Sequence, residues 1–301
     1  MKKIVLILIL LISLQLLPSC DSNPEYPVTV NGVTVKRQPL KAVSLAPFIT
    51  DIAVSLGYEP ILVGISDGYT GKIKELPEMG SAVSPDLKKI EALKPDIVLT
   101  GTEMNKNETE YLRSRSIDVV VMPNPVTMEE LKTAYTDLAA LLGGNITGKP
   151  KGETAYNKLI SDIEAGLSKS GDTSGACWIL ALPNLVVTGD SLLSAVMELS
   201  GAGNIAKSNK DYSIDISDIR SLNPDVIFCN PGFAESIKAH ENYADLSACV
   251  NNRVIEIEIP ADKILPSDFP AVAKAISEAL TAPQPEMDAP PPESGGEPPA
   301  E

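Results

Sequence analysis

The sequence predicts an α/β protein with two lobes, each built on a parallel sheet, and one long helix that joins them. Residues 41–69 have the pattern of a buried strand, a helix and a second buried strand, which is typical of a parallel sheet covered by helices. Residues 86–99 and 215–228 repeat one helix–proline–strand pattern. Residues 148–168 form a helical pattern, and a helix of that length spans about 30 Å. The repeat and the long helix together predict two similar lobes.

The first residues predict export and lipid attachment. Two lysines precede an almost wholly apolar stretch over residues 4–17, which is the pattern of a secretory signal. The ending LPSC at residues 17–20 resembles a bacterial lipobox, in which the cysteine becomes the lipidated first residue. We expect residues 1–19 to be a lipoprotein signal peptide and Cys20 to anchor the chain on the outer face of a cell membrane. An ordinary export signal with an unmodified cysteine is the alternative.

Residues 20–39 predict a tether followed by a small edge hairpin. Two alternating β runs flank Asn31-Gly32, a pair that strongly favours a two-residue hairpin turn. In the strand–helix–strand unit that follows, Thr50 is the expected N-cap of the helix and Gly57 its expected C-terminal stop. The strands on either side of this helix are two apolar runs, 42–45 and 61–65.

The first lobe spans residues 40–145 and continues with alternating helices and strands. Ser84 and Pro85 are the expected cap and first residue of a helix that ends before Pro95. The other elements expected here are a strand over 96–100, a helix over 108–114, a strand over 118–122 and a helix over 127–142.

The linking helix lies in residues 146–171, and the second lobe spans residues 172–281. Its expected elements are strands at 176–180, 225–228 and 253–259, an extended segment at 185–188, helices that begin near Ser191 and Asp215, and a closing helix at 271–280. Residues 282–301 are acidic, rich in proline and poor in apolar side chains, so we expect a disordered tail.

Composition excludes several functions. The net charge of −15 argues against nucleic-acid binding, which requires basic patches. The single histidine, His240, lies in a polar stretch, and no phosphate loop or nucleophile–base set is present, so we expect neither catalysis nor a cofactor. One histidine also makes a site for a bare metal ion improbable. Cys177, Cys229 and Cys249 lie in apolar runs and are expected to be buried free thiols. Nothing in the sequence indicates oligomerisation, so a monomer is expected.

The candidate ligand site follows from the strand exits. In parallel sheets, ligands bind outside the carboxyl ends of the strands, and a cleft between two lobes is a common place for them. Of the residues at these exits, Phe48 and Tyr69 are the strongest candidates for ligand contact. The full set in the first lobe is Pro47, Phe48, Asp67, Tyr69, Thr102 and Glu103, and in the second lobe Pro183, Asn184, Tyr212, Asn230 and Phe233. Ordinary turn formation is the alternative role of several of them.

The motifs resemble one family. VSLAPFITDIAVSLGY, VGISD and PDLKKIEALKPDIVLTG are similar to the first lobe of class III substrate-binding proteins of ABC importers, the cobalamin-, siderophore- and haem-binding proteins. VTGDSLLSAVMELSGAGNIA and the NPDVI repeat are similar to the second lobe. The resemblance covers about residues 26–281 and is greatest to the cobalamin type. It implies two Rossmann-like lobes on a rigid backbone helix, the class III fold, and extracytoplasmic capture of a ligand for a permease.

The resemblance also implies contacts with the permease through one surface glutamate on each lobe. The first is absent at its expected place, and the second aligns with Ser217. Glu75 or Glu78 in the first lobe and Asp218 in the second are the candidates to replace them.

Three ligand classes and a second function remain open. The ligand is a corrinoid, haem or a ferric siderophore, with Tyr69 or Tyr212 as candidate axial ligands for haem. Arginine is scarce and absent from the expected strand exits, which favours a less anionic ligand such as a corrinoid. The alternative function is a membrane-tethered ligand sensor or adhesion module that retains the bilobed fold.

Overall fold

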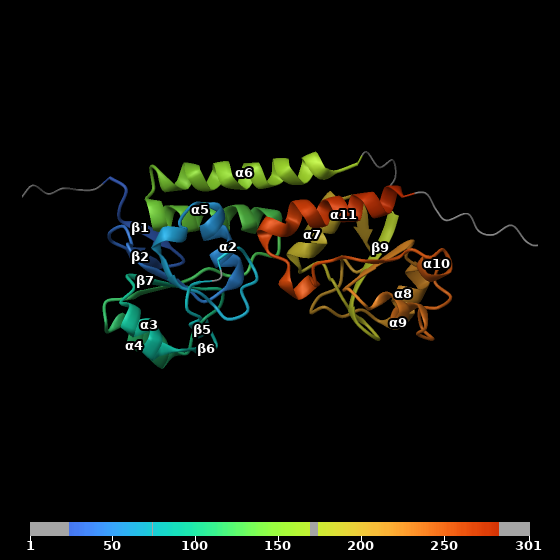
Figure 1. Cartoon of the computed structure of the whole chain (residues 1–301), viewed down its shortest axis with the longest axis horizontal. Helices are drawn as coiled ribbons and strands as arrows, with labels where there is room; N and C mark the ends of the chain where they lie inside the picture. Colours follow the sequence, from blue (N-terminus) through green and yellow to red (C-terminus); the bar gives the residue numbers. More distant parts are fainter. Residues whose placement is uncertain (1–23, 74, 169–173, 283–301) are drawn as a thin grey trace, which may run out of the picture.

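The protein is described by a computed structural model over residues 24–73, 75–168 and 174–282. It consists of two α/β lobes side by side, with helix α6 (Gly148–Gly166) lying along both of them (Figure 1). The predicted fold class is thereby confirmed. Cys20, the predicted signal peptide (residues 1–19) and nearly all of the predicted tail (residues 282–301) lie outside the described residues.

A four-stranded parallel sheet forms the centre of the first lobe, in the order β4-β3-β7-β8. The strands are β3 (Ala42–Ser44), β4 (Leu62–Gly64), β7 (Ile97–Thr100) and β8 (Asp118–Val121). The helices are α2 (Pro47–Ser55), α3 (Leu87–Leu93), α4 (Lys106–Arg113) and α5 (Met128–Gly143), with a 3-10 turn η1 (Glu59–Ile61) before β4. The predicted hairpin forms from β1 (Val28–Val30) and β2 (Val33–Val35), and β5 (Gly80–Ser81) pairs with β6 (Ser84–Pro85).

The second lobe is built around the strand β9 (Ser174–Ala181). On one side β9 pairs in parallel with β12 (Val226–Cys229), and β13 (Val254–Glu256) lies beyond β12. On the other side it pairs with β11 (Ala202–Asn204) and, antiparallel, with β10 (Leu185–Val186). The helices are α7 (Leu192–Leu199), α8 (Ile216–Leu222), α9 (Ala234–Lys238), α10 (Ser247–Val250) and α11 (Phe269–Thr281), with 3-10 turns η2 (Ala261–Lys263) and η3 (Pro266–Asp268).

The repeat in the sequence is also a repeat in the structure. Helices α3 and α8 both end on a left-handed residue before proline, at Lys94 (φ 50°) and Asn223 (φ 44°). The aspartate after that proline then holds the start of the neighbouring strand. Asp96 Oδ2 accepts from the backbone N–H of Lys41 at 3.0 Å, and Asp225 Oδ2 accepts from that of Gly175 at 3.1 Å. The repeated aspartates therefore secure the strand register in both lobes.

Two predicted helix starts are wrong. Helix α2 begins at Pro47 rather than after Thr50, because proline fits the first helical position and has no N–H to leave unpaired. Thr50 and Asp51 therefore lie inside the helix and are buried. Ser84-Pro85 forms strand β6 instead of starting α3, and Asp86 caps that helix by accepting from the Lys89 N–H at 3.0 Å.

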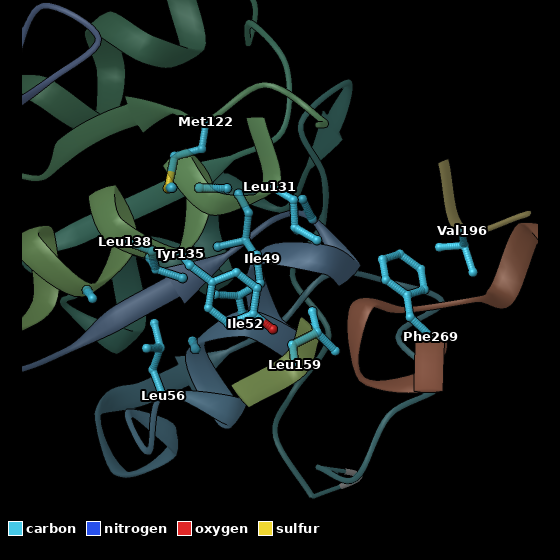
Figure 2. Packing of buried hydrophobic residues seen from close by; sticks show 14 of the residues in the cluster. Ile49, Ile52, Leu56, Met122, Leu131, Tyr135, Leu138, Leu159, Val196 and Phe269 are labelled. Carbon is cyan, nitrogen blue, oxygen red and sulfur yellow. The ribbon is translucent and has the colours of Figure 1, made fainter. Parts of the chain in front are cut away.

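The two lobes share a single hydrophobic cluster. Ile49 and Tyr135 of the first lobe, Leu159 of α6, and Val196 and Phe269 of the second lobe belong to it. Figure 2 shows Ile49 and Tyr135 grouped in the first lobe, and Phe269 beside Val196 in the second lobe. Because burial of apolar surface is the main stabilising term in folding, this shared core favours a fixed arrangement of the lobes. Helix α6 packs on both α5 and α11, as its length predicted.

Candidate ligand-binding site

A cleft lies between the lobes and consists of two adjoining hollows. The interlobe hollow has a volume of about 290 Å³ and is lined by both lobes. The lobe-2 hollow has a volume of about 450 Å³ and is lined by the second lobe alone. The two share five lining residues, Ser191, Leu193, Tyr212, Ala261 and Asp262. The interlobe hollow is also lined by Pro47, Phe48, Asn124, Pro125, Val126, Asp190, Leu192, Ile264, Leu265, Pro266 and Phe269.

The first-lobe wall forms where the strand order reverses, between β3 and β7. Pro47 and Phe48 start helix α2 directly after β3, and Gly101 follows β7. A Cβ atom at Gly101 would lie 3.2 Å from Cε1 of Phe48 and 3.0 Å from Oδ1 of Asn124. Glycine at this position therefore lets Phe48 and Asn124 lie close over the end of the sheet, the usual ligand position in such folds.

The second-lobe wall is held by local hydrogen bonds. Ser191 caps helix α7 by accepting from the Leu193 N–H at 3.3 Å. Asn230, at the exit of β12, accepts from the Ala261 N–H at 2.9 Å through Oδ1. That bond fixes the segment 261–269, which crosses from the second lobe towards the first. The Nδ2 atom of Asn230 makes no hydrogen bond to the described residues and is free to donate to a ligand.

The lining of both hollows is mainly apolar, and its charged groups are all acidic. They are Asp190, Asp211 and Asp262, while none of the described lining residues is Lys, Arg or His. The hydroxyl of Thr188 and the amide of Asp211 hold the pKa of Asp190 below its usual value. Asp262 makes an ion pair of 3.3 Å with Lys263 beside the cleft. Such a lining suits binding of an uncharged or cationic ligand, and it contains no nucleophile–base pair.

The structure brings four of the predicted ligand residues to the cleft, namely Pro47, Phe48, Tyr212 and Asn230. Tyr69 lies in a separate hollow with Ile73 and Leu76, and its hydroxyl folds over Gly71. Burial raises the pKa of Tyr69 to about 12, which opposes a phenolate ligand there. Asp67 is exposed and accepts from the Gly80 N–H at 3.0 Å.

The remaining predicted residues lie outside the lining of both hollows. Thr102 and Glu103 are exposed beyond β7. Pro183 accepts from the hydroxyl of Tyr243 through its carbonyl, and Asn184 Nδ2 donates to the Ile214 carbonyl at 3.1 Å. Phe233 packs on the core of the second lobe. The contacts of Pro183 and Asn184 join segments within the second lobe.

Several lining residues were not predicted. Asn124 and Pro125 follow β8, so the same strand-exit rule could have found them. The segment 261–269 follows no strand directly and carries no comparable signal.

Asp51, which lies inside helix α2, joins the two lobes. Its Oδ2 accepts from the backbone N–H of Ser267 at 2.8 Å, and its Oδ1 accepts from the Ser267 hydroxyl at 2.7 Å. Ser267 belongs to η3 in the second lobe.

The three described cysteines are free, as predicted. Cys177 and Cys229 are buried, and burial raises the pKa of each thiol to about 12, so both are unreactive at neutral pH. Within the described ranges, no group of His, Cys, Asp and Glu side chains could hold a metal ion, and no helix is long and apolar enough to cross a membrane.

The architecture is that of a bilobed solute-binding protein. Its two α/β lobes share a core, are joined by a bridging helix and enclose a cleft. The chain belongs to the periplasmic binding protein family, whose model matches residues 43–260. It is a substrate-binding protein of the ABC-transporter type, and hence a binding protein and not an enzyme.

Known proteins of this type resemble it over most of their length. The ABC transporter substrate-binding lipoprotein YvrC of Bacillus subtilis is 24% identical over 253 residues, which cover 77% of this chain and 79% of YvrC. The vitamin B12-binding protein of Vibrio campbellii is 26% identical over 199 residues, covering 63% and 70% of the two chains. The heme-binding protein HutB of Vibrio cholerae has the same fold, with a TM-score of 0.67 at 19% identity over 81% of this chain and 99% of HutB.

Proposed function

We propose that this protein is a lipid-anchored, extracytoplasmic substrate-binding protein that captures a corrinoid in the interlobe cleft and delivers it to an ABC importer. The observation that carries the choice of ligand is the charge of the cleft. Three aspartates and no described cation line the two hollows. Haem propionates and ferric siderophores are anionic and would meet unfavourable charge there, because like charges repel. Similarity to a vitamin B12-binding protein supports the same choice.

A thermal-shift screen of the mature chain tests this ligand class. Cyanocobalamin and dicyanocobinamide are expected to raise the melting temperature, whereas hemin, ferric citrate and ferric siderophores leave it unchanged. Stabilisation should follow the ligand concentration, reaching about 2.7 kcal/mol at a hundredfold excess over Kd. A shift with an iron compound alone would replace the corrinoid by that compound. No shift with any of them would remove the main support for an importer of this type.

Aromatic variants locate the bound ligand. Phe48→Ala and Tyr212→Ala each remove a ring that lines the interlobe hollow, so each is expected to weaken ligand binding about tenfold or more. Tyr69→Ala is the matched control, because Tyr69 lies outside the cleft and its loss should leave the Kd nearly unchanged. The reverse pattern in calorimetric titrations would move the site to the hollow beside Tyr69.

Anchoring and docking are tested together by ligand uptake in cells. Cys20→Ser is expected to release the protein from the membrane fraction. Glu75, Glu78 and Asp218 are all exposed, and Asp218 lies in the first turn of α8. Reversing their charges to Lys should reduce uptake while ligand affinity stays unchanged, because docking to basic permease residues would be lost. Glu153→Lys on α6 is the control, and equal uptake in all variants would argue for a sensor or adhesion role instead.

A further inference from the structure

Two consecutive residues at the cleft have an unusual backbone. Asp211 (φ 57°) and Tyr212 (φ 56°) both adopt the left-handed conformation, although neither is glycine. This conformation is strained for a residue with a side chain and persists only when the surroundings impose it. Strain of this kind concentrates at ligand sites, so its cause in this turn is informative.

Hydrogen bonds from the exit of β10 hold the turn. Oδ2 of Asp190 accepts from the Asp211 N–H at 3.0 Å, and Oγ1 of Thr188 accepts from the Tyr212 N–H at 3.1 Å. The Thr188 hydroxyl in turn donates to Oδ1 of Asp190 at 2.6 Å. The Tyr212 carbonyl accepts from the Val186 N–H at 2.9 Å. Three hydrogen bonds therefore fix the backbone of two adjacent residues, and Thr188, which is fully buried, links two of them.

The turn places the ring of Tyr212 between the two hollows. Tyr212 is one of the residues that line both, and its exposed fraction is 45%, although an aromatic ring is favoured in a core. The interlobe hollow of about 290 Å³ lies at the lower limit of ligand pockets, which span about 300–1,000 Å³. A ligand that is too large for the interlobe hollow and extends into the lobe-2 hollow therefore passes Tyr212, which lines both.

We propose that Asp190 and Thr188 are positioning residues that hold Tyr212 in its left-handed turn as the wall against which the ligand packs between the two hollows. This inference rests on the proposed function and deepens it. The ring is fixed before the ligand arrives, so binding need not order it, and such preorganisation increases affinity. The apolar side chains of Leu185, Val187 and Leu193 line the lobe-2 hollow beside Tyr212, where they would pack against an uncharged part of the ligand.

Thr188→Val tests the inference, because valine keeps the shape of threonine and removes the hydroxyl. Hydrogen exchange should become faster at the amides of Val186, Asp211 and Tyr212, and the affinity for cyanocobalamin should fall about tenfold or more. Thr188→Ser restores the hydroxyl and should restore both. Asp211→Gly in the Thr188→Val background should recover part of the affinity, because glycine adopts the left-handed conformation without strain.

Thr100→Val is the matched control. Thr100 is a buried threonine at the end of β7 in the other lobe, where its hydroxyl donates to the Thr102 carbonyl at 2.7 Å, outside the cleft. Thr100→Val should leave hydrogen exchange in the turn at residues 211–212 unchanged, and it should not alter the Kd for cyanocobalamin. Unchanged hydrogen exchange in Thr188→Val would show that the Thr188 hydroxyl does not hold the turn at residues 211–212. Faster exchange with an unchanged Kd would show that holding this turn does not contribute to ligand binding. If the unmodified chain does not bind cyanocobalamin, the proposed corrinoid function fails, while the exchange experiment still decides whether Thr188 and Asp190 hold the turn at residues 211–212.

Discussion

Asp51→Ala is expected to lower the free energy of unfolding by about 2–3 kcal/mol and to loosen the two lobes relative to each other. Asp51 is 4% exposed, and both of its carboxylate oxygens accept from Ser267 of the opposite lobe. Removing the carboxylate leaves the backbone N–H of Ser267 without this partner and leaves space in the interlobe contact. Urea denaturation measures the loss in the free energy of unfolding, and small-angle scattering measures the change in the arrangement of the two lobes.

A double-mutant cycle separates this contact from other effects. Ser267→Ala removes only the bond from the hydroxyl, so its cost should be smaller, and the two substitutions together should cost less than their sum. Additive losses would show that Asp51 acts through its own lobe and not through Ser267.

The same carboxylate gives a pH dependence with a defined sign. Burial is the main cause that raises the pKa of Asp51 above 3.8. The hydrogen bonds from Ser267 and the positive charge of Lys72 lower this pKa, and the negative charge of Asp268 raises it. A raised folded-state pKa means that the contribution to stability is fully present below the unfolded pKa and is lost as the pH rises through the folded value. The asparagine side chain in Asp51→Asn cannot ionise, so this variant should not show the loss of stability as the pH rises. Parallel stability curves for the two proteins between about pH 4 and 7 would contradict the expectation.

Gly152→Ala is the second substitution with a large expected effect. A Cβ atom at Gly152 would lie 2.5 Å from the Tyr135 carbonyl oxygen and 2.7 Å from Cα of Thr136, both on α5. Because these are backbone atoms, the helices must separate, and overpacking of this kind costs about 1–3 kcal/mol. Helix α6 also packs on α11, so the displacement should extend to the second lobe. Thermal unfolding measures the cost, and ligand affinity measures its consequence for the cleft.

Gly166→Ala is the matched control at the other end of the same helix. Its Cβ would lie 3.3 Å from Cβ of Lys274, a much milder approach than the 2.5 Å contact with backbone at Gly152. Alanine is the better helix former by about 1 kcal/mol, so Gly166→Ala should be nearly neutral or stabilising. Equal destabilisation by both substitutions would show that the close approach of α5 and α6 is not the cause.

Local patterns predicted most of the fold because the physics involved is short-range. The NG turn, the glycine after α2, the helix that begins near residue 127 and the bridging helix all appear near their expected positions. The Thr127 hydroxyl accepts from the Glu130 N–H at 3.2 Å, as a capping pattern requires. The helix starts predicted at Thr50 and Ser84 are wrong because another local signal prevailed at each place. Pro47 starts helix α2 before Thr50, and Ser84 pairs in strand β6 instead of capping α3.

The sequence by itself determined that this is a two-lobed binding protein, because local hydrophobic patterns predict the alternating helices and strands, the repeat and the long helix. It also placed Phe48 and Tyr212 at strand exits and turns that line the cleft. Only the tertiary structure decided that Tyr69 lies elsewhere, that residues 261–269 complete the wall and that Asp51 contacts Ser267. These contacts join segments far apart in the chain, up to 216 positions for Asp51 and Ser267. Their formation depends on how the lobes close over a shared core, which no local pattern specifies.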